Sequence, residues 1–80
     1  MTEQKIQSKK IKELEAEGYY VVKLIMTNKN GIPDLLVLPP DCEAFFVEVK
    51  RPGGRTSKIQ DYRIKELRDH GIRVLIHGRE

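Results

Sequence analysis

The chain has only one cysteine, Cys42, among its 80 residues. A single thiol cannot form an intramolecular disulfide, and it cannot supply a cysteine-based zinc cluster. No apolar run approaches the length of a membrane-spanning helix, and residues 1–5 lack the apolar core of a secretory signal. We therefore expect a cytoplasmic protein in a reducing setting, with no membrane partner.

Eighty residues also leave little material for a hydrophobic core, and they predict one domain spanning residues 1–80. A chain of this length buries only somewhat more than about 60% of its unfolded surface, so its stability is marginal without support. Because disulfide bonding is excluded, we expect support from oligomerisation, most simply a homodimer with two-fold symmetry.

Hydrophobic periodicity and turn residues predict six elements, with no repeats or low-complexity tracts between them. In chain order they are a helix capped by Thr2 and running to about residue 17, strands at 19–26, 34–38 and 44–50, a helix capped by Thr56 or Ser57 and reaching about residue 70, and a strand at 72–76. The order α-β-β-β-α-β predicts an α/β fold. Its first three strands can form an antiparallel meander, and its last two strands should be parallel because a helix joins them.

The basic residues are unevenly distributed, although the net charge of +3 is modest for a nucleic-acid-binding protein. The segment 49–60 has no acidic residue and four basic ones: Lys50, Arg51, Arg55 and Lys58. Such a patch can neutralise several phosphates and make binding depend on salt. A solvated loop with ordinary surface charges would have the same composition.

Two short motifs indicate chemistry. Asp34 follows Gly31-Ile32-Pro33, and the triplet Glu48-Val49-Lys50 ends an apolar strand. Two carboxylates can hold a hard divalent cation, and the neighbouring ammonium can orient a water or stabilise a phosphate. This is the set of groups that a metal-dependent phosphodiesterase needs.

Strand geometry brings the members of the triplet together. Alternate side chains share a face, so Phe46, Glu48 and Lys50 lie on one side, and Glu48 and Lys50 are roughly 6.5–7 Å apart along the strand. Both can therefore reach one metal–phosphate centre. An ion pair on a solvent-facing strand would give the same spacing.

Asp34 has a similarly defined position. Gly31 allows a tight turn and Pro33 fixes the backbone just before the acid, so Asp34 begins a strand at a rigid point suited to a metal ligand. The alternative is a Pro-Asp turn in which Asp34 accepts a hydrogen bond from the local backbone.

The first helix places two polar residues on its apolar face. Ile6, Ile11 and Leu14 span about 140° of arc, and Glu3 and Gln7 fall inside it. Burying polar side chains there is unfavourable unless they find partners, and a metal cluster would provide one. Glu3 can instead be a first-turn acid that complements the helix dipole.

The second helix repeats the pattern, because Gln60 lies within the arc of Ile59, Ile64 and Leu67. Gln60 also fits a capping box with Ser57. We expect Gln60 to serve both as the capping residue and as a polar group on the inner face only if its side chain has the conformational freedom to do so.

Together, Glu3, Gly31-Ile32-Pro33-Asp34, Glu48-Val49-Lys50 and Gln60 resemble the VRR-NUC family, a branch of the PD-(D/E)xK nuclease superfamily. The resemblance covers essentially the whole chain and is closest to the stand-alone, virus-type members. It implies a restriction-endonuclease-like fold, an α-β-β-β-α-β core with a small mixed sheet flanked by helices. It also implies Mg²⁺- or Mn²⁺-dependent cleavage of DNA, with homodimers and branched substrates such as Holliday junctions in the stand-alone members.

Carried over by position, the resemblance assigns a role to each motif residue. The metal ligands would be Glu3, Asp34, Glu48 and the backbone carbonyl of Val49. The catalytic residues would be Asp34, Glu48, Lys50 as the catalytic lysine, and Gln60 as a supporting polar group. DNA contacts are expected from the basic patch that includes Lys50, Arg51, Arg55 and Lys58.

Two other classes of function are consistent with parts of the sequence. One is a non-catalytic DNA-binding module that uses the basic patch from Arg51 to Lys58. The other is a small interaction protein whose charged residues merely cover its surface. Metal-dependent activity would distinguish the enzyme from both of these. Salt-dependent DNA binding would distinguish the DNA-binding module from the interaction protein.

Overall fold

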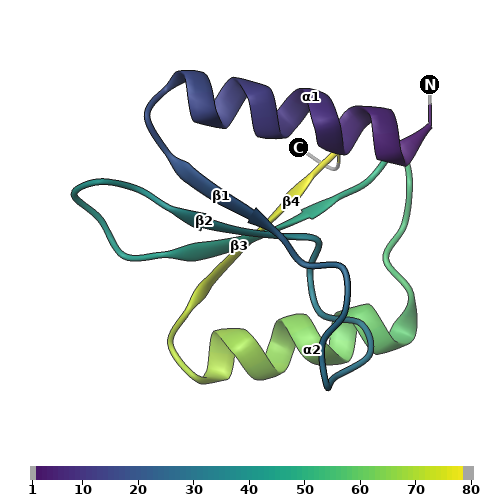
Figure 1. Ribbon diagram of the computed structural model, residues 1–80. Helices are drawn as coiled ribbons and strands as arrows, with labels where there is room; N and C mark the ends of the chain where they lie inside the picture. Colours follow the sequence, from purple (N-terminus) through teal and green to yellow (C-terminus); the bar gives the residue numbers. More distant parts are fainter. Residues whose placement is uncertain (1, 79–80) are drawn as a thin grey trace.

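The computed structural model describes residues 2–78, which form two helices and one four-stranded sheet (Figure 1). In chain order the elements are α1 (Glu3–Ala16), β1 (Tyr20–Lys23), β2 (Leu35–Leu38), β3 (Phe45–Val49), α2 (Lys58–Asp69) and β4 (Arg73–His77). The predicted α-β-β-β-α-β order is confirmed. No helix in this part of the chain is long and apolar enough to cross a membrane.

The strands lie in the order β1-β2-β3-β4. β1 pairs with β2 and β2 with β3 in antiparallel fashion, whereas β3 and β4 are parallel. The antiparallel meander and the parallel last pair are therefore as predicted. α2 is the connection that allows β4 to run alongside β3 in the same direction.

The first strand is shorter than the sequence predicts. It was expected to reach Met26, but it ends at Lys23, which pairs with Leu35, the first residue of β2. Ile25 and Met26 have no strand opposite them and are 85% and 91% exposed. The start of the partner strand, rather than β-propensity, sets this boundary.

The two helices cover opposite faces of the sheet (Figure 1). α1 packs on β1 and β3, over a core formed by alternate strand residues together with one helix residue. Its members are Leu14, Leu35, Val37, Phe45, Val47 and Val49. On the other face, α2 packs on β4, and Ile64 and Val74 are buried there.

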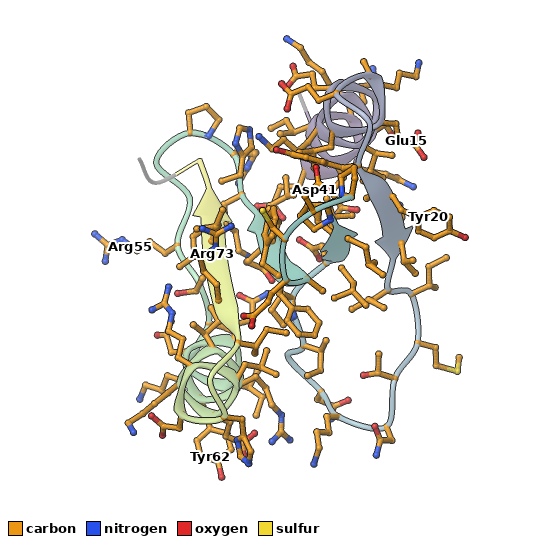
Figure 2. The ribbon with its side chains drawn as sticks, turned by 90° about the vertical axis from the view of Figure 1, so that its left-hand side faces the viewer. Glu15, Tyr20, Asp41, Arg55, Tyr62 and Arg73 are labelled. Atoms are coloured by element: carbon orange, nitrogen blue, oxygen red, sulfur yellow. The ribbon has the colours of Figure 1, made fainter. Side chains whose placement is uncertain are left out.

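Neither helix covers the whole face on which it lies. Among the described residues the backbone of α2 lies close to β4 but not to β1 or β2, and apolar side chains on that side of these two strands remain open. Tyr20, Val22 and Leu38 are 71%, 36% and 39% exposed, and Figure 2 shows Tyr20 directed outward from the sheet. We call these three residues the open sheet face.

Gly31 fixes the start of α2 against the loop that precedes β2. Its φ is +82°, and a Cβ at this position would lie 2.9 Å from the backbone carbon and oxygen of Ile59. Arg63 adds a second link, because its Nε donates to the carbonyl of Asn30 at 2.7 Å. The glycine thus lets the first turn of α2 approach the sheet closely enough to place Gln60 beside β3.

We expect Gly31→Ala to destabilise the protein more than Gly18→Ala. Both glycines have positive φ, so each substitution costs about 1–2 kcal/mol of backbone strain. Nothing lies within 4 Å of a Cβ at Gly18, whereas Gly31→Ala adds an overlap that costs about 1–3 kcal/mol. Urea unfolding midpoints of the two variants measure the difference, and equal midpoints would contradict the close approach to α2.

Candidate active site

Most of the predicted site residues lie where β3 ends and α2 begins; these two ends are on the right of Figure 1. Asp34 immediately precedes β2, Glu48 is the penultimate residue of β3, and Lys50 directly follows that strand. Gln60 lies in the first turn of α2. Three elements that are distant in sequence therefore contribute to one cluster.

Glu48 is the centre of this cluster and is only 1% exposed. The Nζ atom of Lys50 lies 3.4 Å from its Oε2, and the Nε2 atom of Gln60 donates to the same oxygen at 3.2 Å. The other oxygen, Oε1, is buried and has no hydrogen-bond partner among the described residues. Because an unsatisfied buried carboxylate oxygen is costly, this atom is suited to coordinate a bound cation.

Gln60 performs both of the roles considered in the sequence. Its Oε1 accepts from the backbone N–H of Ser57 at 2.8 Å, and the Ser57 hydroxyl accepts from the backbone N–H of Gln60 at 3.2 Å. Its Nε2 remains available for Glu48. Both roles hold at once in a single conformation, because the two ends of one amide serve the two partners.

Asp34 is held by β3 rather than by its own turn. Its Oδ2 accepts from the backbone N–H of Val49 at 2.9 Å, and its carbonyl accepts from the N–H of Leu24 at 2.8 Å. The first bond joins residues fifteen apart in sequence, so the local-turn alternative does not describe this carboxylate. Asp34 is thereby fixed beside Glu48.

The proximity of the two carboxylates alters the acidity of the buried one. The pKa of Glu48 is raised to about 7, first by burial of the carboxyl group and second by the charge of Asp34. The ammonium of Lys50 opposes both effects. A divalent cation would stabilise the ionised form and take the place of the proton.

Asp34 and Glu48 fit a hard cation such as Mg²⁺ or Mn²⁺, since they offer carboxylate oxygens of which one is buried without a partner. Within residues 2–78 there is no group of three or more His, Cys, Asp or Glu side chains that could hold a metal ion. The structure therefore does not bring Glu3, at the start of α1, into such a group with the other two acids. Metal coordination by Glu3 and by the Val49 carbonyl stays a prediction.

The basic patch divides into two parts. Arg51, Arg55 and Lys58 are exposed, and Figure 2 shows Arg55 directed away from the body of the protein. Lys50 is only 9% exposed and faces Glu48. It therefore belongs to the carboxylate cluster, and the other three form the accessible surface.

Sequence reasoning did not single out Lys9 and Lys10 of α1, which lie beside the segment that follows Lys50. In a helix with four lysines, nothing in the spacing distinguishes these two from a solvated face. Gln7, which the helix periodicity does place on the inner face, has a buried Oε1 atom with no partner in the described part of the chain.

A mixed sheet between two helices, with paired carboxylates, a lysine and an amide at its end, defines a nuclease-type domain. The family model of the VRR-NUC domain matches residues 2–78, and the chain belongs to that family. A solved structure titled "VRR_NUC domain" is similar to it, with a TM-score of 0.85 and 32% sequence identity, over 95% of this chain and 83% of that chain. No curated protein sequence matches the chain.

These comparisons confirm the predicted family and the restriction-endonuclease-like fold. VRR-NUC domains form a nuclease-type family that generally uses divalent metals, and a nuclease domain implies DNA as the partner.

The raised pKa of Glu48 predicts how stability depends on pH without metal. Between about pH 4.5 and pH 7 the unfolded chain loses the Glu48 proton while the folded chain retains it. Protonation therefore stabilises the fold at low pH, and the free energy of unfolding should fall with rising pH across this interval, by about 3 kcal/mol at most. Urea unfolding in chelator measures the change.

Glu48→Gln is the matched control, because it keeps the shape of the side chain and removes the titration. We expect the difference in unfolding free energy between wild type and this variant to change across the same interval. A difference that is independent of pH would contradict the raised pKa.

Proposed function

We propose that the protein is a Mg²⁺- or Mn²⁺-dependent endonuclease that hydrolyses DNA phosphodiester bonds. The observation that carries the proposal is the buried carboxylate of Glu48, held on one oxygen by Lys50 and Gln60 and without a partner on the other. An ion pair that served only stability would not need a second carboxylate beside it, since Asp34 makes ionisation of Glu48 harder.

Charge explains why a cation would be required. Two carboxylates and one ammonium carry a net charge of −1 when all three are ionised, so the cluster alone repels a phosphodiester. A divalent ion held by Asp34 and Glu48 would reverse this charge, lower the pKa of a bound water and neutralise the non-bridging oxygens. This argument favours an enzyme over a DNA-binding module that does not cut.

The residues of the chain have distinct parts in such a reaction. The Val49 N–H fixes Asp34, and Gln60 holds Oε2 of Glu48 so that Oε1 keeps one orientation. The ammonium of Lys50 is close enough to orient the attacking water or to stabilise charge on the phosphate in the transition state. Preorganisation of this kind reduces the reorganisation needed during reaction.

We expect Asp34→Asn and Lys50→Ala to abolish metal-dependent cleavage while the fold and DNA binding persist. Asn at position 34 can still accept the hydrogen bond from Val49, so it removes the charge without leaving that N–H unpaired. The loss should be at least about 100-fold in rate, as for other groups that stabilise transition-state charge. Cleavage of labelled DNA with Mg²⁺, Mn²⁺ or chelator gives the rates.

The assay should use linear, flapped, forked and four-way DNA, because we propose that branched substrates, Holliday junctions among them, are preferred. Equal cutting of plain duplex and four-way DNA would count against that preference. Wild-type rates in either variant would remove its residue from the mechanism. Binding without cleavage in any metal would instead favour the non-catalytic DNA-binding module.

We also propose that the protein acts as a homodimer, in which a second copy covers the open sheet face. Tyr20, Val22 and Leu38 are the large apolar side chains that the chain's own helices leave uncovered on this side. A small domain with marginal stability gains most from burying such a surface. Two active sites related by a two-fold axis could then address two strands of a symmetric junction.

The open sheet face makes the dimer testable. Val22→Glu should convert a two-chain species to a single chain at micromolar concentration, because it places an unpaired charge at the centre of an apolar contact. Val22→Thr is the control, since it keeps the β-branched shape. Light scattering measures the mass, and a wild-type mass of one chain would refute the dimer.

A further inference from the structure

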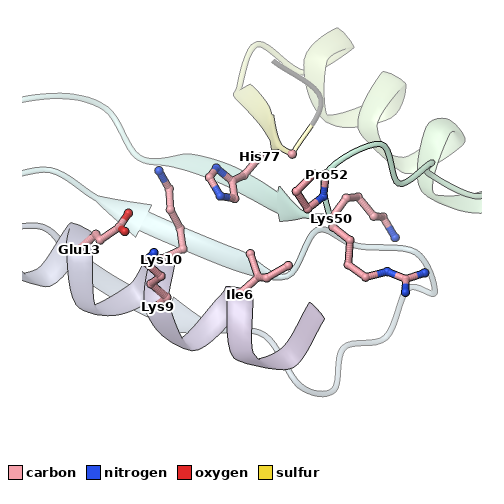
Figure 3. A pocket seen from close by; sticks show the side chains of 9 residues that line it. Ile6, Lys9, Lys10, Glu13, Lys50, Pro52 and His77 are labelled. Carbon is pink, nitrogen blue, oxygen red and sulfur yellow. The ribbon is translucent and has the colours of Figure 1, made fainter. Parts of the chain in front are cut away.

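A second concave surface adjoins the carboxylate cluster, between α1, the segment after β3 and the end of β4 (Figure 3). It encloses about 600 Å³, within the range of about 300–1,000 Å³ for pockets that hold small organic ligands. It exists because the backbone of α1 lies close to β1 and β3 but not to β4 in the described part of the chain. We call it the α1–β4 pocket.

The α1–β4 pocket is strongly basic. Lys9, Lys10, Lys50 and Arg51 line it, and among the described residues Glu13 is its single acid. Within residues 2–78 none of Lys9, Lys10 and Arg51 forms an ion pair, so this part of the protein leaves their charges unneutralised. Such a pocket attracts an anion with several oxygens, as a phosphate group has.

Its remaining walls are apolar or aromatic. Ile6 and Pro52 face each other across the opening, and the imidazole of His77 lies at its side (Figure 3). A free phosphate would not use these walls. The flat face of a nucleobase would, because bases stack on aromatic rings and apolar side chains once they leave their own helix.

The pocket also shares one residue, Lys50, with the proposed catalytic centre. Lys50 lines it, and the Nζ atom of the same residue lies 3.4 Å from Glu48. A DNA strand held at Lys50 would therefore pass close to the pocket. A duplex shows its phosphates on a convex surface and keeps its bases stacked, so it cannot fill a hollow of this shape.

We propose that the α1–β4 pocket binds one unpaired nucleotide of a DNA strand, with its base against Ile6, Pro52 and His77 and its phosphate held by Lys9 and Lys10. This inference rests on the proposed nuclease function and names how a branched substrate is distinguished from plain duplex. Unpaired nucleotides occur at forks and flaps, and a duplex offers none.

The test measures binding of a short oligothymidine in chelator, where no cleavage occurs. Lys9→Ala/Lys10→Ala should reduce the affinity about tenfold and lower the slope of log affinity against log salt by about 0.7, since the two lysines hold one phosphate and each neutralised phosphate of a single strand contributes about 0.7. Lys5→Ala/Lys12→Ala is the matched control. It removes two charges from the same helix at positions that do not line the pocket, and it should leave the slope nearly unchanged.

Two further probes test the unpaired base. A blunt-ended duplex of two separate, fully complementary strands should lose less than about threefold in affinity on Lys9→Ala/Lys10→Ala, because it lacks an unpaired nucleotide that can enter the pocket. An abasic oligomer with the same number of phosphates should bind the wild type several-fold more weakly than oligothymidine, because it offers no base to stack.

Equal weakening by the two lysine pairs, or an equal loss for the blunt-ended duplex and oligothymidine, would overturn the proposal and leave a general charge effect. Equal binding of abasic and thymidine oligomers would also overturn it. Because no metal is present, these results do not depend on catalysis. Absence of metal-dependent cleavage would refute the nuclease function while this binding remained measurable.

Discussion

The burial of Glu48 is the constraint around which the structure is arranged. A carboxylate that is almost inaccessible to water must be neutralised, paired or ligated, and here Lys50 and Gln60 satisfy one oxygen while the other stays unsatisfied. Asp34 raises the free-energy cost of ionising Glu48 further by placing a second negative charge nearby. The rest of the fold is what holds these opposing groups together, from the Asp34–Val49 hydrogen bond to the close approach of Gly31 and Ile59.

The uneven cover of the sheet explains how a chain this short can offer several surfaces. α1 lies over β1 and β3, and α2 packs on β4, so one region of each face stays open. On the α1 side the opening is basic and adjoins the carboxylates, and on the α2 side it is apolar. The first suits a nucleic-acid strand and the second suits another protein surface, so two helices suffice to leave room for both.

Local patterns were enough to predict the order of elements and to bring Glu48 and Lys50 together, but not to predict that Gln60 contacts Glu48. Strand alternation puts Glu48 and Lys50 on one face, and the helical repeat turns Gln60 inward. Neither pattern says how far along the sheet a helix sits, so the sequence could not show that Glu3 stays outside a three-acid group or that Lys9 and Lys10 border a pocket. The end of β1 could not be predicted from local patterns either, because the start of β2 determines it.

The amide of Gln60 has a consequence for which side chains position 60 can accept. Its oxygen closes the first turn of α2, and its nitrogen meets Glu48. A glutamate would keep the helix cap but set a third negative charge against the pair, and an asparagine is one methylene too short to span both partners. Glutamine is therefore the side chain that matches both the length and the polarity of this bridge. A substitution at position 60 thus changes the cap of α2 and the hydrogen bond to Glu48 together.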